Sequence, residues 1–557
     1  MKKIISILLT LSVIVSAFTA CSRENPAPSA DGASVNITLS DDGVLVDGQP
    51  APSDSSAAVY TANDIIFYLA GQGADYGEGE EREEHTQEEA DKHTVIHITQ
   101  PGNYTITGSL SYGQIAVNLG EDAKDNPDAV VNLTLNGTDL TCTVAPAIIC
   151  YSAYECGSDD TETATMNVDT AAAGFNLIVA DGTVNNISGS HVARIYKPGT
   201  TDKLHKYDAA IESLVSLNID GTDGVLNLTS DNEGIETKLH MTINGGIIDI
   251  NSTDDSLNAG EDYVSVITIN DGQILANANN GLEGDGIDSN GWLVINGGMV
   301  SAFSSDRSMD SGLDSDNGII INGGIVYATG CMYDQISSES AQSVAVFSLD
   351  EWVYSEEYVV LKSSADETVA AFKSTADHKV IVYSSPLLTE DDYTLYKAQS
   401  VAGDSLNGIY TQVEEMTGET QLAHSSRGGF GGQRPEGGAM PEKEGAEPFE
   451  KPEGEMPQGG MEKPEGEMPM KGERPEIPEG FENMTPPEGF TGEAPEKPED
   501  FNGEMPQMPE NSDGQPSHGG RPQGEGGFDV AGDSRATTAF TFTKGINLFS
   551  GVKAYTA

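Results

Sequence analysis

The chain has 557 residues and a formal net charge of −61, because 89 acidic residues face 28 lysines and arginines. A charge this negative excludes nucleic acid as a partner, since its phosphates would be repelled, and it allows an acidic polymer to bind only through an intervening cation. The length exceeds that of one typical domain, which favours two folded parts together with unstructured segments.

Residues 1–21 have the pattern of a secretory signal. Lys2 and Lys3 precede an apolar run at 4–17, and small residues lead to Cys21. The run is too short for a membrane-spanning helix. A cysteine in this position is also typical of a lipoprotein signal, although Phe18 stands where such signals usually have leucine. We therefore expect export, with acylated Cys21 holding the protein at the extracellular face of the cell membrane. Plain secretion is the alternative.

Three polar segments are expected to lie outside the folded core. Residues 22–34, rich in Pro, Ala and Ser, are expected to form a tether, and the charged residues 77–92 an exposed loop. Residues 425–530 repeat strings such as KPEGEMP, so this insertion is expected to be disordered and extended by self-repulsion. The strand-like residues 346–424 and 531–557 on either side are expected to form one small β-sandwich-like C-terminal domain.

Residues 35–345 contain a repeat with steps of 24 to 26 residues. The string INGG occurs three times, and INDG and IDGT once each. The isoleucines of these strings are Ile219, Ile243, Ile269, Ile295 and Ile321. Each copy has a short alternating strand, a glycine turn and a second alternating strand, without helical periodicity. This pattern predicts an all-β fold, with a right-handed parallel β-helix over residues 35–345.

Apolar anchors in successive repeats are followed by polar, mostly acidic residues. The anchors are Ile211, Ile235, Leu257, Ile287 and Leu313. The residues that follow them are Glu212, Glu236, Asn258, Asp288 and Asp314. Further acids near the anchors are Asp208, Asp231, Glu233, Asp254, Asp255, Glu283, Asp285, Asp310 and Asp316. Because neighbouring rungs of a β-helix lie about 4.8 Å apart, we expect the residues after the anchors to stack in a row.

Stacked carboxylates require compensation. Two of them roughly 5 Å apart repel by about 3 kcal/mol at an effective dielectric constant of about 20. Protonation, basic partners or a bound cation could relieve this repulsion, and Lys238 and Arg307 are the only basic residues that we expect nearby. Oxygen ligands in this number suit Ca²⁺, which takes about 6–8 of them. We therefore interpret the row as one or more calcium sites, with a solvated acidic edge as the alternative.

Several longer strings carry a family resemblance. They are ITQPGNYTITGSLSYGQIAVNL (98–119), DAAIESLVSLNIDGTDGVLNLTSDNEGIETK (208–238), the INGG repeats, and TLYKAQ and GINLFSG nearer the C-terminus. With them the chain resembles a calcium-associated carbohydrate-binding β-helix family of anaerobic bacterial surface proteins, related in fold to pectate lyases. The resemblance implies binding of cellulose or acidic pectic polymers, with calcium held by acids of the rungs. The inserts at 153–170 and 188–207, and Asn258, depart from the family pattern.

Three functions are compatible with this sequence. In the first, calcium ions keep open coordination positions that uronate carboxylates of a polysaccharide complete, without catalysis. The aromatic residues that could contact sugar faces there are Trp292, Tyr263, Tyr327 and Tyr333. The second is a calcium-dependent polysaccharide lyase with Lys238 or Arg307 as the base. The third is an adhesin or scaffold for a protein partner. The small number of basic residues favours the first, and nothing in the sequence indicates an oligomeric state.

Overall fold

The computed structural model describes residues 34–410, 412–425 and 536–555. Strands dominate these ranges, and helix is limited to short pieces such as α2 (Gln87–Ala90). The prediction of an all-β fold is therefore confirmed. No helix within the described ranges has the length and apolar character that crossing a membrane requires.

Several predicted segments lie outside the described residues. They are the signal at 1–21 with its Cys21, the tether at 22–34 except for its last residue, and the insertion at 425–530 except for its first residue. The expectations for these segments stay predictions.

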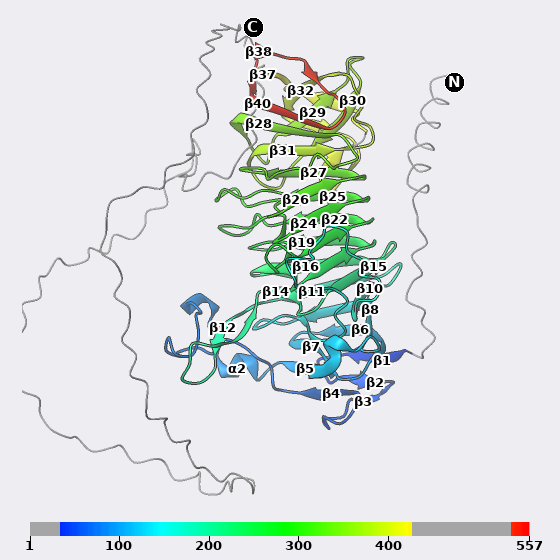
Figure 1. Ribbon diagram of the computed structural model, residues 1–557, viewed down its shortest axis with the longest axis vertical. Helices are drawn as coiled ribbons and strands as arrows, with labels where there is room; N and C mark the ends of the chain where they lie inside the picture. The colour runs from blue at the N-terminus through cyan, green and yellow to red at the C-terminus, as the bar shows by residue number, and fades with distance from the viewer. Residues whose placement is uncertain (1–33, 411, 426–535, 556–557) are drawn as a thin grey trace, which may run out of the picture. The chain divides into compact units, whose positions relative to one another are not determined.

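Most strands belong to three parallel ladders along one stack of rungs (Figure 1). The first ladder consists of β6 (Gly102–Leu110), β8 (Val131–Thr141), β10 (Phe175–Val179), β15 (Leu217–Gly221), β18 (His240–Ile243), β21 (Val266–Ile269), β24 (Trp292–Ile295) and β26 (Gly318–Ile321). The second ladder continues from the end of β8 through β11 (Val184–Gly189), β16 (Val225–Ser230), β19 (Ile247–Asn251), β22 (Gln273–Asn277), β25 (Met299–Phe303) and β27 (Ile325–Gly330).

The third ladder carries the acidic residues singled out above. It consists of β5 (Thr94–Ile98), β7 (Gly113–Asn118), β9 (Ile148–Ser152), β14 (Ala209–Ser213), β17 (Glu233–Thr237), β20 (Leu257–Ala259) and β23 (Ile287–Ser289). Successive rungs thus contribute one strand to each ladder, which is the stacking that the repeat predicts. The right-handed sense of the coil stays a prediction.

The isoleucines of the repeat stack in register. Ile219 pairs with Ile243, Ile243 with Ile269, Ile269 with Ile295, and Ile295 with Ile321. All five side chains are buried. Because alternate residues of a strand face opposite sides, this register forms one aliphatic column inside the stack and points the neighbouring residues outward. Burial of apolar surface, at about 25 cal/mol per Å², therefore holds each rung in place.

The asparagines of the repeat form a second column. The Nδ2 group of Asn270 donates to Oδ1 of Asn244 at 2.9 Å, Asn296 donates to Asn270 at 3.0 Å, and Asn322 donates to Asn296 at 2.9 Å. Asn244 in turn donates to Oδ1 of Asp220 at 3.0 Å. Each amide is both donor and acceptor, so one residue type at this position satisfies its neighbours on both sides. This ladder explains the asparagine of INGG.

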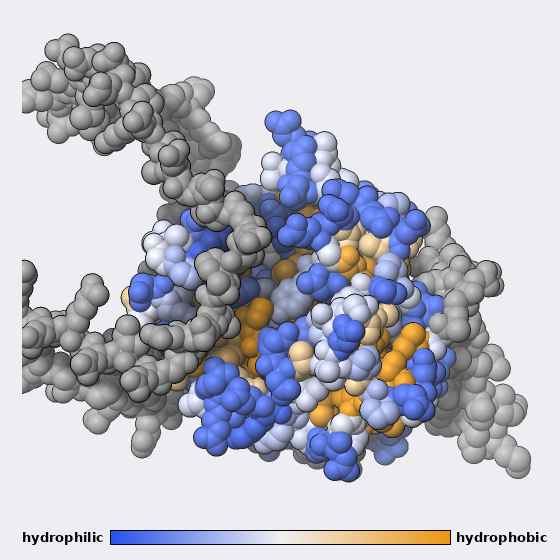
Figure 2. Space-filling view, turned by 90° about the horizontal axis from the view of Figure 1, so that it is seen from below, coloured by the Kyte–Doolittle hydropathy of each residue, from blue (hydrophilic) through white to orange (hydrophobic). Residues whose placement is uncertain are grey.

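Antiparallel strands cover both ends of the stack. At the N-terminal end β4 (Val59–Ala62) pairs antiparallel with β5, and Figure 2 shows a mixed polar and apolar surface on that end. At the other end β31 (His378–Ser384) pairs antiparallel with both β27 and β28 (Val344–Val353). An open edge would expose unpaired backbone groups, and these strands pair with the end strand of the third ladder on one side and of the second ladder on the other.

The C-terminal strands extend the second ladder instead of beginning a separate sheet. Through β31 the ladder continues to β28, and β28 pairs in parallel with β40 (Ile546–Ala554). β40 also pairs with β37 (Thr420–Ser425), so chain segments from both sides of the insertion lie in one sheet. Tyr327 of the last rung stacks on Phe372 at 4.8 Å between ring centroids, within a core shared by both parts.

The second glycine of INGG provides a test of the stacking. Gly298 has φ +79°, and a Cβ there would lie 2.7 Å from the carbonyl oxygen of Gly272 on the rung before. Gly246 has φ +95°, but its nearest atom would be 3.8 Å away. We expect Gly246→Ala to lower the free energy of unfolding by about 1 kcal/mol through backbone strain, and Gly298→Ala by about 3 kcal/mol because the rungs must also separate. Thermal unfolding followed by circular dichroism measures both; equal losses would contradict close packing of the turns.

Candidate functional site

Residues on the outer face of the third ladder stack as the sequence predicts. The apolar anchors are in register from rung to rung. In the same register Glu212 pairs with Glu236, Glu236 with Asn258, and Asn258 with Asp288. Asp314 follows Leu313, whose bridge to Ile287 continues the column. We call Glu212, Glu236, Asn258, Asp288 and Asp314 the acidic row.

Two groups of acids on this ladder come close enough to share an ion. The N-terminal cluster consists of Asp208, Glu233 and Glu236. The C-terminal cluster consists of Asp285, Asp288 and Asp314. In each cluster one carboxylate oxygen per residue lies within 4.8 Å of the others. Two atoms that both lie about 2.4 Å from one calcium ion are at most about 4.8 Å apart, so each cluster has a spread that a single ion can bridge.

Carboxylates at the N-terminal end of the row are buried. Glu212 is 2% exposed and Glu233 is 7% exposed. Burial, and after it the charge of Glu236, raises the pKa of both residues well above the ordinary value. For Glu236, burial and then the charge of Asp208 raise the pKa to about 7. These side chains therefore favour the neutral form unless a cation compensates them.

Further along the row, carboxylates bond to the backbone of the next rung. Oδ1 of Asp255 accepts from the amide of Asp285 at 2.6 Å, and Oδ1 of Asp285 accepts from the amide of Ser311 at 2.6 Å. Burial is the main cause that raises the pKa of Asp255 and Asp285, and burial with the charge of Glu283 raises the pKa of Asp254 to about 6. These acids join the rungs as well as lining the site.

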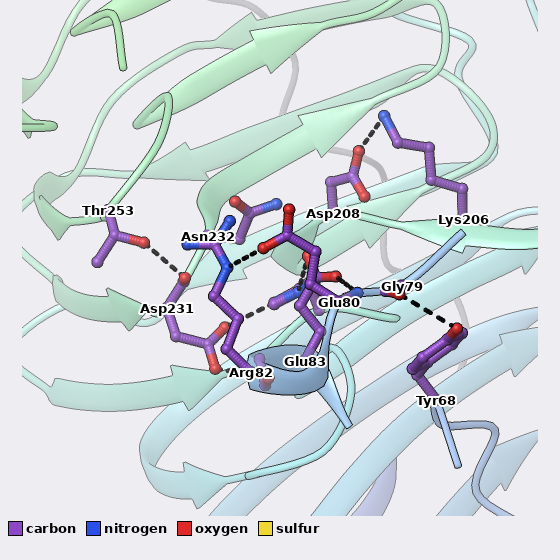
Figure 3. A network of polar contacts seen from close by, with 12 residues as sticks. Tyr68, Gly79, Glu80, Arg82, Glu83, Lys206, Asp208, Asp231, Asn232 and Thr253 are labelled. Carbon is purple, nitrogen blue, oxygen red and sulfur yellow. Dashed lines mark hydrogen bonds and ion pairs between the residues drawn. The ribbon is translucent and has the colours of Figure 1, made fainter. Parts of the chain in front are cut away.

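Two basic residues of the insert 188–207 contact acids near the N-terminal end of the row. Lys206 forms an ion pair with Asp208 (Figure 3). The ring of His191 lies between two carboxylates. Its Nδ1 is 3.0 Å from Oδ1 of Asp231, and its Nε2 is 3.4 Å from Oε1 of Glu83. Burial lowers the pKa of His191, but the bond to Asp231 and both carboxylate charges raise it, and the net shift is upward.

These contacts correct two expectations. Lys238 and Arg307 are not the only basic residues near the row, because the hairpin β12 (Val192–Tyr196) and β13 (Lys203–Tyr207) brings Lys206 to it. The charged segment 77–92 is mostly exposed, as expected, but the expectation of a simple loop was incomplete: its turn η1 (Glu81–Glu83) lies beside Asp231 (Figure 3). His191 contacts both Glu83 and Asp231. The repeat could not reveal either contact, since both segments lie outside its period.

Two buried oxygen atoms in the site have no hydrogen-bond partner within the described ranges. They are Oε2 of Glu233 and Oδ1 of Asn258. The remaining polar atom of each side chain is paired, since Nδ2 of Asn258 donates a hydrogen bond to Oε1 of Glu233 at 3.1 Å. A buried acceptor without a donor costs about 1–3 kcal/mol. Carboxylate and amide oxygens are both ligands that Ca²⁺ accepts, so the residues present fit such an ion.

The remaining acids lie at the edge of the site. Asp231, Glu283 and Asp316 are exposed. Oδ2 of Asp310 accepts from the backbone amide of Gly284 at 2.8 Å, which gives this residue a structural bond. The structure therefore brings six of the predicted acids into two clusters and leaves these four outside them. The other three, Glu212, Asp254 and Asp255, lie close enough to the clusters for the charges of cluster residues to raise their pKa.

The four aromatic candidates differ in their surroundings. Tyr327 is fully buried in the core shared with the C-terminal strands, and Tyr333 packs against the main core. Trp292 packs with Met166 and Val168 of the insert 153–170 against an outer apolar patch. Tyr263 is 59% exposed and has φ 61°, a conformation that costs a non-glycine residue energy. Among the four, Tyr263 has the accessible ring.

The two basic residues proposed for a lyase lie far apart along the stack. Lys238 follows β17 and its Nζ lies 3.8 Å from Oε2 of Glu261. Arg307 is exposed and lies shortly before the anchor Leu313 in the sequence. Leu313 is three rungs beyond Ile235, the anchor that precedes Lys238. Three rungs correspond to roughly 14 Å.

The raised pKa of Glu236 predicts a pH dependence of stability. The folded protein keeps this proton up to about pH 7, whereas the ordinary value is 4.5, so without metal the folded state binds more protons between these values. The free energy of unfolding should therefore fall as the pH rises from about 5 to about 7.5. Thermal unfolding in a chelator should show this fall, and Glu236→Gln should reduce it.

The control for this experiment is Glu390→Gln, since Glu390 is exposed and belongs to neither cluster. It should unfold like the unsubstituted protein at both pH values. A melting temperature that rises from pH 5 to pH 7.5 in chelator would contradict the burial of charged carboxylates.

Comparison with known proteins gives two matches. A family model described as carbohydrate-binding domain-containing protein matches residues 92–378, just over half of the 557 residues. The solved structure of the polysaccharide lyase-like protein from C. thermocellum, a gadolinium derivative, aligns with 18% identity and a TM-score of 0.30 over 53% of this chain and 90% of that chain. No curated protein matches the chain.

Proposed function

The chain belongs to the family of carbohydrate-binding domain-containing proteins, and from this we propose that its third ladder binds an acidic polysaccharide through Ca²⁺ held by the N-terminal and C-terminal clusters. Residues 92–378, which carry the family match, include both acidic clusters. The observation that carries the proposal is the buried Oε2 of Glu233, which has no hydrogen-bond donor among the described residues, while Oε1 of the same carboxylate accepts from Nδ2 of Asn258.

The donor set supports calcium over smaller or softer ions. The clusters offer carboxylate oxygens, and Asn258 adds an amide oxygen between them. Hard oxygen ligands without sulfur suit Ca²⁺ and Mg²⁺, and the larger ion tolerates irregular sets of about 6–8 ligands. Asp208, Glu233 and Glu236 would hold one ion, and Asp285, Asp288 and Asp314 another. A bound calcium ion supplies positive charge and open positions that a carboxylate of the ligand can fill.

The charge of the chain supports an acidic rather than a neutral ligand for such a site. At a net charge of −61 a polyuronate would be repelled without a cation. With calcium in the row, each uronate carboxylate would meet a divalent ion. The exposed ring of Tyr263 offers a flat surface for a sugar face beside the ladder, and its carbonyl accepts from Nδ2 of Asn317 at 2.9 Å, which steadies the turn.

Retention on immobilised polygalacturonate tests this function. We expect the protein to bind in 1 mM calcium and to elute with chelator, because the bridging ion is removed. Glu233→Gln and Asp288→Asn should each weaken retention at least about tenfold, since each removes one charge from a cluster (about 1.4 kcal/mol). Glu390→Gln, an exposed position outside both clusters, should bind normally.

The same assay separates the competing functions. Rising ultraviolet absorbance from unsaturated products would show lyase activity in place of simple binding. Retention that is unchanged in chelator would contradict the calcium bridge. Equal retention on cellulose would contradict selection of an acidic polymer, and failure to bind any polysaccharide would favour a protein partner.

We also propose that Cys21 carries a lipid anchor at the extracellular face of the membrane. The signal pattern at 1–21 supports it. Cells expressing the full chain should incorporate an alkyne-labelled fatty acid into it and keep it in the membrane fraction, whereas Cys21→Ser should lose the label and appear in the medium. A labelled Cys21→Ser variant would contradict this anchor.

A further inference from the structure

The hairpin β12–β13 is a basic element in a strongly acidic chain. It spans the insert that links β11 of the second ladder to β14 of the third, with Val192 paired to Tyr207 and Tyr196 to Lys203. Its basic residues are Arg194, Lys197, Lys203 and Lys206. Asp202 is its one acid, whereas acids outnumber basic residues about threefold in the chain as a whole.

The outer side of this hairpin is held by a different segment. The backbone amide of Glu78 donates to the carbonyl of Arg194 at 2.7 Å, and that of Tyr196 donates to the carbonyl of Tyr76 at 2.7 Å. Arg194 also forms an ion pair with Glu78. The hairpin therefore keeps its position through backbone bonds that do not involve Lys206.

The inner strand of the hairpin delivers an ammonium group to the N-terminal cluster. Nζ of Lys206 pairs with Oδ2 of Asp208, which is buried, while the lysine side chain stays 53% exposed (Figure 3). Burial disfavours the charged lysine, but the charges of Asp208, Glu236 and Glu233 favour it and keep its pKa above the ordinary value. The ammonium thus interacts with the same three carboxylates that form the cluster.

We propose that Lys206 is an internal counter-ion of the N-terminal cluster, which competes with a divalent metal ion for Asp208 and is released when the metal binds. This inference rests on the calcium function proposed above. Oδ2 of Asp208 holds the ammonium, and the cluster oxygens that would bind the calcium ion lie within 4.8 Å of one another, so the two cations would be close enough for their like charges to repel. The exposed, flexible lysine stem can swing into solvent, since the hairpin backbone is fixed elsewhere.

Chemical labelling of the unsubstituted full chain tests the release directly. Lysines are acetylated briefly with and without 1 mM calcium, and the modified residues are quantified by mass spectrometry. The reactivity of Lys206 should rise severalfold with calcium, because its amine leaves the ion pair. Lys203, on the same strand and without an ion pair to the cluster in the described part of the chain, should not change.

Metal binding to variants tests the competition. Calorimetric titration with calcium should show roughly three- to tenfold tighter binding at one site in Lys206→Met, the range expected for removing a partly exposed ion pair. Lys206→Arg, which keeps the charge, and Lys203→Met should bind like the unsubstituted protein. In a Glu233→Gln background, which impairs the N-terminal cluster, Lys206→Met should no longer change the affinity.

The outcomes distinguish this inference from the function on which it rests. Calcium binding of equal affinity in Lys206→Met and the unsubstituted protein, with unchanged labelling, would overturn only the role of Lys206. Tighter binding that persists in the Glu233→Gln background would also overturn it, because the effect would then be general electrostatics. If none of these proteins binds calcium while circular dichroism shows them folded, the proposed function and this inference both fall.

Discussion

Parallel stacking in register forces equivalent residues of successive rungs to lie about 4.8 Å apart, whatever charge they carry. On the third ladder this rule brings Glu212, Glu236 and Asp288 into one column with Asn258. The charges cannot separate by slipping, because a shift of one residue would turn the buried anchors outward. The favourable burial of the apolar anchors on the inner face of each strand thus holds the carboxylates of the outer face together against their mutual repulsion.

The protein relieves that repulsion differently on different rungs. Asp255 and Asp285 accept hydrogen bonds from backbone N–H groups of the following rung, so part of their negative charge is stabilised by the backbone itself. Asp208 has the ammonium of Lys206, and Glu236 has a pKa of about 7 that allows protonation near neutrality. Burial raises the pKa of Glu233 as well, but its Oε2 has neither a hydrogen-bond donor nor a basic partner among the described residues, which makes it the place where an added cation has most to contribute.

The periodicity of the sequence predicts the features that recur on every rung, but not the contacts of the inserted segments. The spacing of Ile219, Ile243 and their successors is sufficient to derive the register of the first and third ladders, because each rung repeats the same burial pattern. The contact of Lys206 with Asp208 could not be derived, since the insert 188–207 has no counterpart on neighbouring rungs. The burial of Tyr327 depends on C-terminal strands distant in sequence, so its exposure could not be judged from its own repeat.

The same geometry explains why a cation-bridged ligand suits this surface better than a neutral one. Hydroxyl groups of a neutral glucan are weak ligands and would leave the column of negative charge uncompensated, whereas a uronate carboxylate and a calcium ion compensate each other and the row together. A row that repeats every 4.8 Å or so also offers several such contacts to one extended polymer, and linked contacts bind far more tightly than separate ones. Under the proposal made for Lys206, this internal lysine at one end would raise the calcium concentration at which the first of these contacts forms.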